Sequence, residues 1–233
     1  MIASLNHNTA IILFSRSVEA EAREKKFIES VGKKIQKRIA STFINHTKSI
    51  CQKSELTFFI SDEKSQRGSN FGERMSFAIE DVFEKGFENV IVIGNDCPTI
   101  STSDIYSAAL SLSTGNSVIG PASDGGVYLF GINRKNFSKE KFTNLTWQTS
   151  NLGLSLANHL KQENSTIDYL KEKSDVDNLL FFKISEIKRI KISIARLLIS
   201  ILSSFSQKKY THDLLILNPV FLTIPKFRGP PTF

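Results

Sequence analysis

The chain has 233 residues, of which 40% are hydrophobic and 23% charged, and its formal net charge is +7. This length and composition are typical of one sizeable soluble domain with an appendage. Its two cysteines, Cys51 and Cys97, argue against a disulfide framework and favour a reducing cytoplasmic location. Residues 1–8 lack the features of a secretory signal, and no apolar run reaches the ~20 residues of a membrane span. We therefore expect a cytoplasmic protein with no transmembrane segment.

The excess positive charge lies at the C-terminal end of the chain. Residues 183–233 contain nine Lys and Arg residues and two acidic residues, whereas residues 1–182 contain 21 of each. The neutral body argues against nucleic acid as a partner. Apolar residues of 183–233 recur at helical spacing and are followed by a basic arm. We expect this extension either to pack on the domain or to mediate homo-oligomer formation.

Strands and helices are predicted to alternate along residues 1–182. In the first half, apolar runs predict strands at 9–14, 56–60 and 89–93, and helical spacing predicts helices over 24–50 and 71–83. In the second half, the predicted strands are 117–120, 127–131 and 166–170, and the predicted helices are 105–112, preceded by a Ser101/Asp104 capping box, and 150–160. This alternation predicts an α/β fold with a mainly parallel, doubly wound sheet flanked by helices.

The segment after the strand at 89–93 is the first candidate site. Its sequence is Gly94-Asn95-Asp96-Cys97-Pro98, and ligands of open parallel sheets bind beyond the carboxyl ends of strands. Gly94 allows close backbone approach, and the Asp96 carboxylate is a ligand of the kind that Mg²⁺ prefers together with phosphate oxygens. The alternative is that Asp96 only caps the turn or helix that follows.

Two further segments offer candidate residues. Asp124-Gly125-Gly126 permits a tight turn that brings backbone N–H groups near a ligand, although an Asp-Gly hairpin turn between two strands is the alternative. Asp175 and Asp177 point to the same side of an extended segment. They either complete a metal site with Asp96 or form a solvated acidic pair.

Together these segments resemble the DUF2064 family of glycosyltransferase-A-like proteins. That family is related to the guanylyltransferases of cofactor F420 synthesis and to the molybdenum-cofactor nucleotidyltransferases. The resemblance covers roughly residues 9–182. The matching pieces are the strand end at Phe14, Gly72-Glu73-Arg74-Met75, the segments at 94–98 and 120–131, Trp147 with Thr149, and Asp175-Val176-Asp177.

The resemblance implies a Rossmann-like, nucleotide-diphosphosugar transferase (GT-A) fold for residues 1–182. It implies a transferase that moves a nucleotidyl or glycosyl group from a nucleotide or nucleotide-sugar donor to a small-molecule acceptor. Mg²⁺ or Mn²⁺ would be held by Asp96, Asp177 and Asp175, and the metal and basic groups would neutralise charge on the phosphates. Asp96 and Asp124 would be catalytic. The implied cofactor-binding residues are Ser15, Arg16, Arg23, Lys26, Arg74, Gly94, Gly125 and Gly126.

The chain departs from the family pattern in residues 14–27. Typical members have a loop with Pro and Gly here, followed by a Lys-Thr-Arg-Leu segment. In this chain, residues 14–27 contain no Pro or Gly, and Glu24-Lys25-Lys26 stands in place of Lys-Thr-Arg. Basic residues persist, but Lys does not replace the bidentate contacts of Arg. The alternative function is therefore a catalytically inactive binding or scaffold protein. Arg74 either reaches a phosphate or pairs with Glu73 or another neighbouring acid.

Overall fold

The computed structural model describes residues 8–25, 27 and 31–174. The chain divides into two units, Met1–Phe182 and Lys183–Phe233, and all described residues belong to the first. The predicted amphipathic helix and basic arm at 183–233 lie outside the described residues, so this part of the domain organisation stays a prediction.

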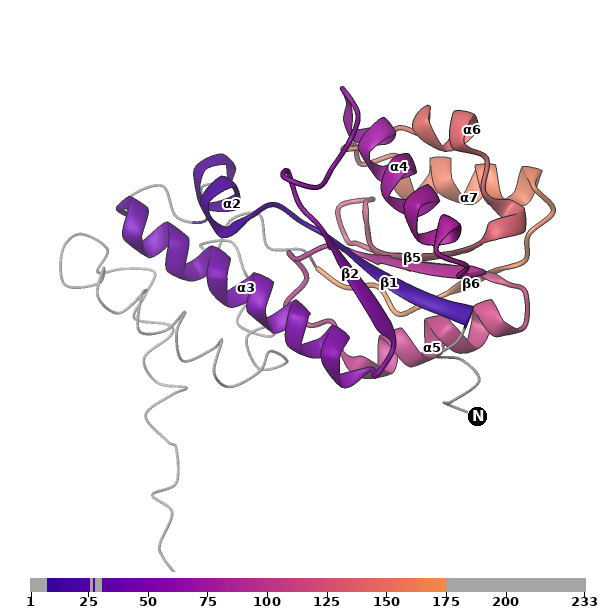
Figure 1. Cartoon of the computed structure of the whole chain (residues 1–233), viewed down its shortest axis with the longest axis horizontal. Coiled ribbons are helices and arrows are strands. Elements are labelled where there is room, and N and C mark those ends of the chain that lie inside the picture. The colour runs from indigo at the N-terminus through magenta and orange to yellow at the C-terminus, as the bar shows by residue number, and fades with distance from the viewer. Residues whose placement is uncertain (1–7, 26, 28–30, 175–233) are drawn as a thin grey trace, which may run out of the picture. The chain divides into compact units, whose positions relative to one another are not determined.

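Strands and helices alternate along the described chain (Figure 1). The strands are β1 (Thr9–Phe14), β2 (Thr57–Ser61), β3 (Asn89–Ile93), β4 (Ser117–Pro121), β5 (Val127–Asn133) and β6 (Ile167–Tyr169). The helices are α2 (Val18–Glu24), α3 (Lys33–Lys53), α4 (Phe71–Glu84), α5 (Thr102–Ser113), α6 (Lys139–Thr143) and α7 (Leu152–Gln162), with a 3-10 turn, η1 (Arg134–Asn136). The sequence predicted these elements except α2, α6 and η1.

The strands form one six-stranded sheet in the order β2-β1-β3-β5-β4-β6. β1 pairs in parallel with β2 and β3, and β4 pairs in parallel with β6. β5 runs antiparallel to both of its neighbours, β3 and β4. The mostly parallel α/β sheet is thus confirmed, with one reversed strand near its centre that the pattern did not predict.

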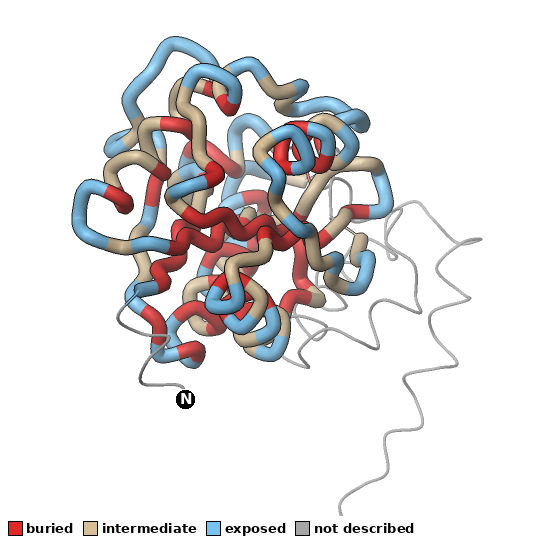
Figure 2. The backbone as a smooth tube through the Cα atoms, turned by 90° about the vertical axis from the view of Figure 1, so that its right-hand side faces the viewer, coloured by how far each residue is buried: buried red, intermediate tan, exposed pale blue. Residues whose placement is uncertain are grey.

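Two apolar layers cover the two faces of the sheet, because side chains alternate along each strand. Figure 1 shows α4, α6 and α7 on one face and α3 and α5 on the other, and a band of buried backbone crosses the middle of Figure 2. The strands β1, β3, β4 and β5 are buried at nearly every residue, whereas the edge strands β2 and β6 are partly exposed. Ala10, Ile12, Val90 and Val92 belong to the first layer, whereas Ile11, Ile91 and Ile93 belong to the second. Within the described residues, no helix is long and apolar enough to cross a membrane.

The helix predicted over 24–50 begins later than expected. α3 starts at Lys33, and Gly32 is its extended N-cap residue, with φ −69° and ψ 159°. Glycine is a poor helix former, so the chain leaves helical geometry there at little cost. Phe27 lies outside α3, although it fits the helical spacing. Its ring is buried against Phe43 at a centroid distance of 5.7 Å.

The predicted capping box at the start of α5 is confirmed. The Ser101 N–H donates to the Asp104 carboxylate at 2.8 Å, and the Ser101 side chain completes the reciprocal contact. Such a pair satisfies N–H groups that have no partner inside the helix. α5 therefore starts close behind the loop at 94–100, and the cap fixes the end of that loop.

Stability is expected to depend on pH through His159, which is buried on α7 with its ring against Phe142. Burial holds the pKa of His159 below its ordinary value, Lys141 acts in the same direction, and Glu163 opposes both. The unfolded state therefore binds the proton more readily, so stability present at neutral pH is lost as pH falls. When the pH is lowered from about 7.5 to 5.5, the free energy of unfolding measured by urea denaturation should fall more for the wild type than for His159→Leu. Equal losses would contradict this account.

Candidate functional site

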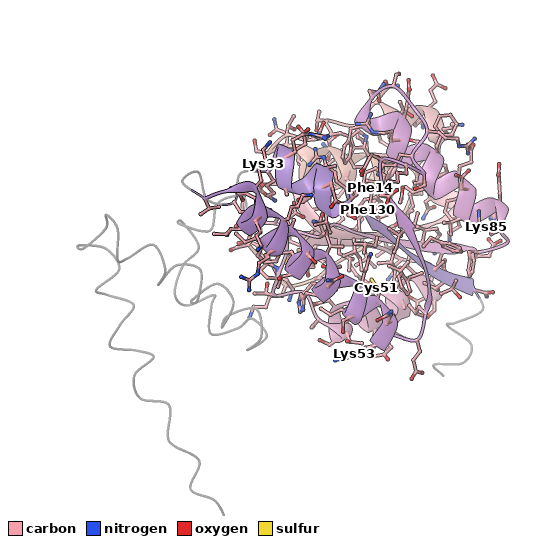
Figure 3. The ribbon with its side chains drawn as sticks, turned by 60° about the vertical axis from the view of Figure 1, so that its left-hand side comes forward. Phe14, Lys33, Cys51, Lys53, Lys85 and Phe130 are labelled. Atoms are coloured by element: carbon pink, nitrogen blue, oxygen red, sulfur yellow. The ribbon has the colours of Figure 1, made fainter. Side chains whose placement is uncertain are left out.

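A cavity of about 720 Å³ lies at the carboxyl ends of β1 and β3. It is lined by residues that follow those strands, by the first turns of α4, by the β4–β5 connection and by residues 147–150. Phe14 and Phe130, both labelled in Figure 3, are part of this lining. The cavity occupies the edge of the sheet where open α/β folds bind ligands.

Of the twelve residues predicted to be catalytic, cofactor-binding or metal-binding, seven line the cavity. They are Ser15, Arg16, Arg74, Gly94, Asp96, Asp124 and Gly126. Arg23 and Gly125 do not line the cavity. The Arg23 side chain is exposed and paired with Glu24 at 2.9 Å. Lys26, Asp175 and Asp177 lie outside the described residues.

Asp96 forms an ion pair with Lys25. The Lys25 Nζ atom, just after α2, lies 3.0 Å from Asp96 Oδ2, and the two side chains are 12% and 37% exposed. A Cβ atom on Gly94 would lie 2.9 Å from Asp96 Oδ1, so glycine leaves room for this carboxylate. Asp96 is thus held by a lysine, while the cap of α5 is formed by Ser101 and Asp104.

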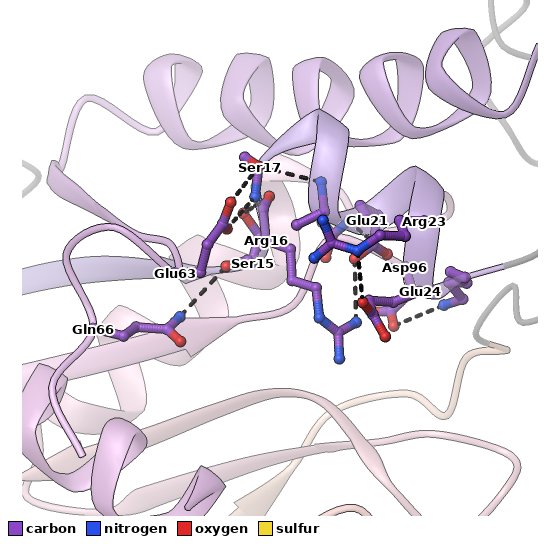
Figure 4. Close-up of polar contacts among 12 residues, drawn as sticks. Ser15, Arg16, Ser17, Glu21, Arg23, Glu24, Glu63, Gln66 and Asp96 are labelled. Carbon is purple, nitrogen blue, oxygen red and sulfur yellow. Dashed lines mark hydrogen bonds and ion pairs between the residues drawn. The ribbon is translucent and has the colours of Figure 1, made fainter. Parts of the chain in front are cut away.

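Glu21 joins the segments that follow β1 and β3 (Figure 4). Its side chain is only 4% exposed, and its carboxylate accepts from Arg16 Nη1 at 3.4 Å and from Asn95 Nδ2 at 3.3 Å. Sequence reasoning missed Glu21 because it did not predict α2. The available signal was Ser17 as an N-cap before acidic residues, since the Ser17 hydroxyl accepts from the Ala20 N–H.

The loop after β2 holds the loop after β1 in place. Glu63 accepts from the Ser17 N–H at 2.7 Å and also from the Ser17 hydroxyl, and Gln66 Nε2 donates to the Ser15 carbonyl at 3.4 Å (Figure 4). Burial alone would raise the pKa of Glu63, but the two bonds from Ser17 outweigh it and keep that pKa below its ordinary value. Glu63 is thus a stable anionic anchor for the start of α2.

Aromatic rings form another part of the lining. The Phe71 ring packs edge-on against Phe14 at a centroid distance of 5.3 Å and tilted against Trp147 at 5.5 Å, and the Phe130 ring lies 6.2 Å from Trp147. Trp147 Nε1 donates to the Phe142 carbonyl at 2.8 Å, which fixes the indole. The cavity therefore has a charged part beside Asp96 and a ring-bearing part that offers stacking surface.

The β4–β5 connection is a hairpin turn that also reaches the cavity. Asp124 Oδ1 accepts from the Gly126 N–H at 2.9 Å, and Gly125 has φ +89°. A Cβ atom on Gly125 would lie 2.0 Å from the Ser150 carbonyl oxygen. Both interpretations of this motif therefore apply, because the turn is a hairpin and its Asp124 and Gly126 line the cavity.

Arg74 lies on α4 and lines the cavity without pairing with Glu73. Glu73 instead accepts from the Ser69 hydroxyl and N–H, and these bonds together with Asn70 hold the pKa of Glu73 below its ordinary value. Arg74 Nη1 donates to the Ser69 carbonyl at 3.5 Å. Arg74 is half-buried in the cavity wall.

The described residues do not fit a divalent metal. Within 8–25, 27 and 31–174, no group of three or more His, Cys, Asp or Glu side chains is placed to hold an ion. Asp96 is paired with Lys25, and one oxygen of Asp124 accepts from Gly126. Asp175 and Asp177, which were expected to complete the site, lie outside the described residues.

Comparison with known sequences identifies the family of this chain. A family model described as "Uncharacterized protein conserved in bacteria (DUF2064)" matches residues 29–149, which is more than half of the chain. The chain belongs to this family. Among curated proteins, none shows a significant sequence match.

A solved structure identifies the fold. A protein from Desulfovibrio desulfuricans G20, described provisionally as a nucleotide-diphospho-sugar transferase, superposes with a TM-score of 0.72 at 22% identity, covering 85% of this chain and 97% of its own. A homologue of Mycobacterium tuberculosis Rv0371c from Mycobacterium sp. strain JC1 has a TM-score of 0.45 at 13% identity, covering 81% and 98%. CMP:2-keto-3-deoxy-manno-octonic acid synthetase, complexed with CTP, has 0.42 at 11%, covering 78% and 97%. The first match shows that this DUF2064 chain has the fold of nucleotide-diphospho-sugar transferases.

Proposed function

We propose that this protein transfers a nucleotidyl or glycosyl group from a nucleotide or nucleotide-sugar donor to a small-molecule acceptor. The observation that carries the proposal is the convergence, in one cavity at the carboxyl ends of β1 and β3, of cationic, carboxylate and aromatic side chains from separate segments. Arg16, Lys25 and Arg74 are suited to phosphate oxygens. Phe71 and Trp147 offer stacking surface to a base or sugar ring.

The proposed reaction needs a proton acceptor and stabilisation of the leaving group. The acceptor oxygen forms a bond to the transferred carbon or phosphorus as the bond to the leaving phosphate breaks, and the hydroxyl proton passes to a carboxylate. Asp124 is the carboxylate that we assign to this step, because it is exposed and lines the cavity. The cations would stabilise negative charge on the leaving phosphate. No step is assigned to a metal.

A ligand panel tests donor binding. ATP, GTP, CTP, UTP, UDP-glucose and GDP-mannose are compared by thermal shift with Mg²⁺ or with EDTA, and at least one should raise the unfolding temperature. The chain has one tryptophan, so quenching of Trp147 fluorescence should report the same binding at the cavity. If no nucleotide changes either signal, the proposed function is wrong.

Asp124→Asn separates binding from turnover. We expect donor affinity to be retained and turnover to fall by about 10²- to 10⁴-fold, since a general base contributes on that order. Donor hydrolysis, followed as released phosphate or pyrophosphate, provides a measurement when the acceptor is not known. Asp168→Asn is the matched control, because Asp168 lies on β6 and bonds Asn116 away from the cavity. Equal turnover in both variants would exclude Asp124 from the reaction.

The second candidate is a binding or scaffold protein that retains nucleotide affinity without catalysis. The Lys25–Asp96 ion pair favours it, because a carboxylate expected at the reaction centre is already engaged within the chain. This candidate predicts donor binding in the ligand panel together with no donor hydrolysis in the wild type. Measurable hydrolysis that Asp124→Asn removes would reject it.

A further inference from the structure

The charge of Asp96 is matched by a cation that belongs to the chain itself. The Lys25 ammonium nitrogen lies 3.0 Å from Asp96 Oδ2, and the lysine is the less exposed of the two, at 12% against 37%. Both residues line the cavity. Lys25 directly follows α2 and Asp96 follows β3, so the pair holds together the two segments that form this part of the site.

A divalent ion on Asp96 would compete with this ammonium group. An ion bound by the Asp96 carboxylate would lie close to Lys25, and like charges repel strongly in a partly buried site. The remaining described residues do not supply three ligands in one place. Within the described residues, the site therefore does not match the divalent-metal site that the family resemblance implies, and Asp175 and Asp177 lie outside those residues.

We propose that Lys25 supplies the positive charge of this site, so that the cleft binds nucleotide phosphates without a divalent metal. The inference rests on the proposed function, which provides the nucleotide class of ligand. Lys25 lines the cavity while its ammonium group contacts Asp96, so its positive charge attracts phosphate oxygens that enter the cavity. Asp96 is then a positioning residue that holds the Lys25 ammonium group at the cavity wall.

Arg16 is a second cation that lines the cavity and is paired with a carboxylate of the chain. Its Nη1 atom lies 3.4 Å from Glu21 Oε2, and the Glu21 carboxylate is buried and also accepts from Asn95. The Arg16 side chain is 46% exposed, and Arg16 lines the cavity. Arg16 precedes α2 and Lys25 follows it, and each is held by a carboxylate. Holding both cations before binding lowers the conformational cost of engaging a phosphate.

Calorimetric titration distinguishes the lysine from a metal. GTP, CTP and UDP-glucose are titrated into the full chain in EDTA and in Mg²⁺, and we expect binding in EDTA within about threefold of the affinity in Mg²⁺. Lys25→Met should weaken binding by about tenfold or more in both buffers, because a charge-assisted hydrogen bond is lost. Lys25→Arg should retain most of the affinity, and Asp96→Asn should lose less than Lys25→Met.

Lys37→Met is the matched control. Lys37 also forms an ion pair, with Glu19 at 3.3 Å, but lies on α3 outside the cavity lining, so this variant should bind as the wild type does. If Lys25→Met does not fold, Lys25→Arg and Asp96→Asn decide the question. Binding that requires Mg²⁺, is abolished by Asp96→Asn and is kept by Lys25→Arg and Lys25→Met would overturn the inference and leave the proposed function standing. An absence of binding in both buffers would reject both.

Discussion

Gly125→Ala is expected to destabilise the folded protein by roughly 2–5 kcal/mol, the sum of a left-handed backbone penalty and a steric clash. Gly125 has φ +89°, and a Cβ atom there would lie 2.0 Å from the Ser150 carbonyl oxygen. That obstacle is backbone and cannot rotate away. The Gly153 N–H also donates to the Gly125 carbonyl at 3.0 Å. Relief of the clash must therefore move the turn at 124–126 relative to residues 147–153.

The same substitution at Gly86 separates the backbone penalty from the steric clash. Gly86 has φ +94°, but a Cβ atom there would meet nothing within 4 Å. Gly86→Ala should therefore cost only about 1 kcal/mol. It lies before β3, at the end of the sheet opposite the cavity, so ligand binding should be unaffected. Urea denaturation followed by Trp147 fluorescence measures both variants. Equal losses would show that the Gly125–Ser150 contact does not constrain the turn.

Ligand binding should respond to Gly125→Ala as well. Asp124, Gly126 and Ser150 all line the cavity, and the expected shift displaces them together. We therefore expect any nucleotide that stabilises the wild type to stabilise Gly125→Ala less. Gly125 thus acts on the site through the position of its neighbours, although it does not itself line the cavity.

Much of the fold was predictable because burial leaves a local pattern. The run Val90-Ile91-Val92-Ile93 is wholly buried and β-branched, which predicts a central strand from sequence alone. The reversed direction of β5 was not predictable in this way. Its core residues Tyr128, Leu129 and Phe130 are buried on both faces, and such a strand has the same pattern in either direction.

Helix α2 left too weak a signal because its stability does not come from an apolar stripe. Its sequence Val18–Glu24 contains three Glu residues, and the one that is buried, Glu21, is paired with Arg16 and Asn95. A buried carboxylate is recognised only when its partners are known, and Asn95 is distant in the sequence. From the sequence, this segment is therefore expected to be a loop that departs from the family pattern, although it is a helix held by polar contacts with distant residues.

The candidate site was predictable in its place but not in its pairings. The strand-end position of Asp96 and the Asp124-Gly125-Gly126 turn follow from element order, and both reach the cavity. The ion pair of Lys25 with Asp96 could not be predicted, because the two residues are 71 positions apart. The sequence shows which residues carry charge, whereas only the folded structure shows which charged side chains form ion pairs.

Phe142→Ala is expected to destabilise the protein by about 3–5 kcal/mol, the usual cost of removing a buried aromatic side chain. Phe142 is fully buried on α6. Its ring packs against four others at centroid distances of 5.4–5.7 Å, and these belong to Phe130, Phe137, Trp147 and His159. The cavity left by alanine is enclosed by rings that cannot collapse into it without losing their own contacts.

The effect should extend to the cavity wall, because Trp147 lines the cavity and packs on Phe142. We expect Phe142→Ala to shift the emission of this single tryptophan in the native state, and its urea midpoint to fall. Leu154→Ala is the control, since Leu154 is 66% exposed on α7 and its loss should cost within about 0.5 kcal/mol. If the native-state Trp147 emission spectrum of Phe142→Ala is identical to that of the wild type, the cavity wall does not depend on Phe142. Stability and ligand recognition could then be changed independently at this position.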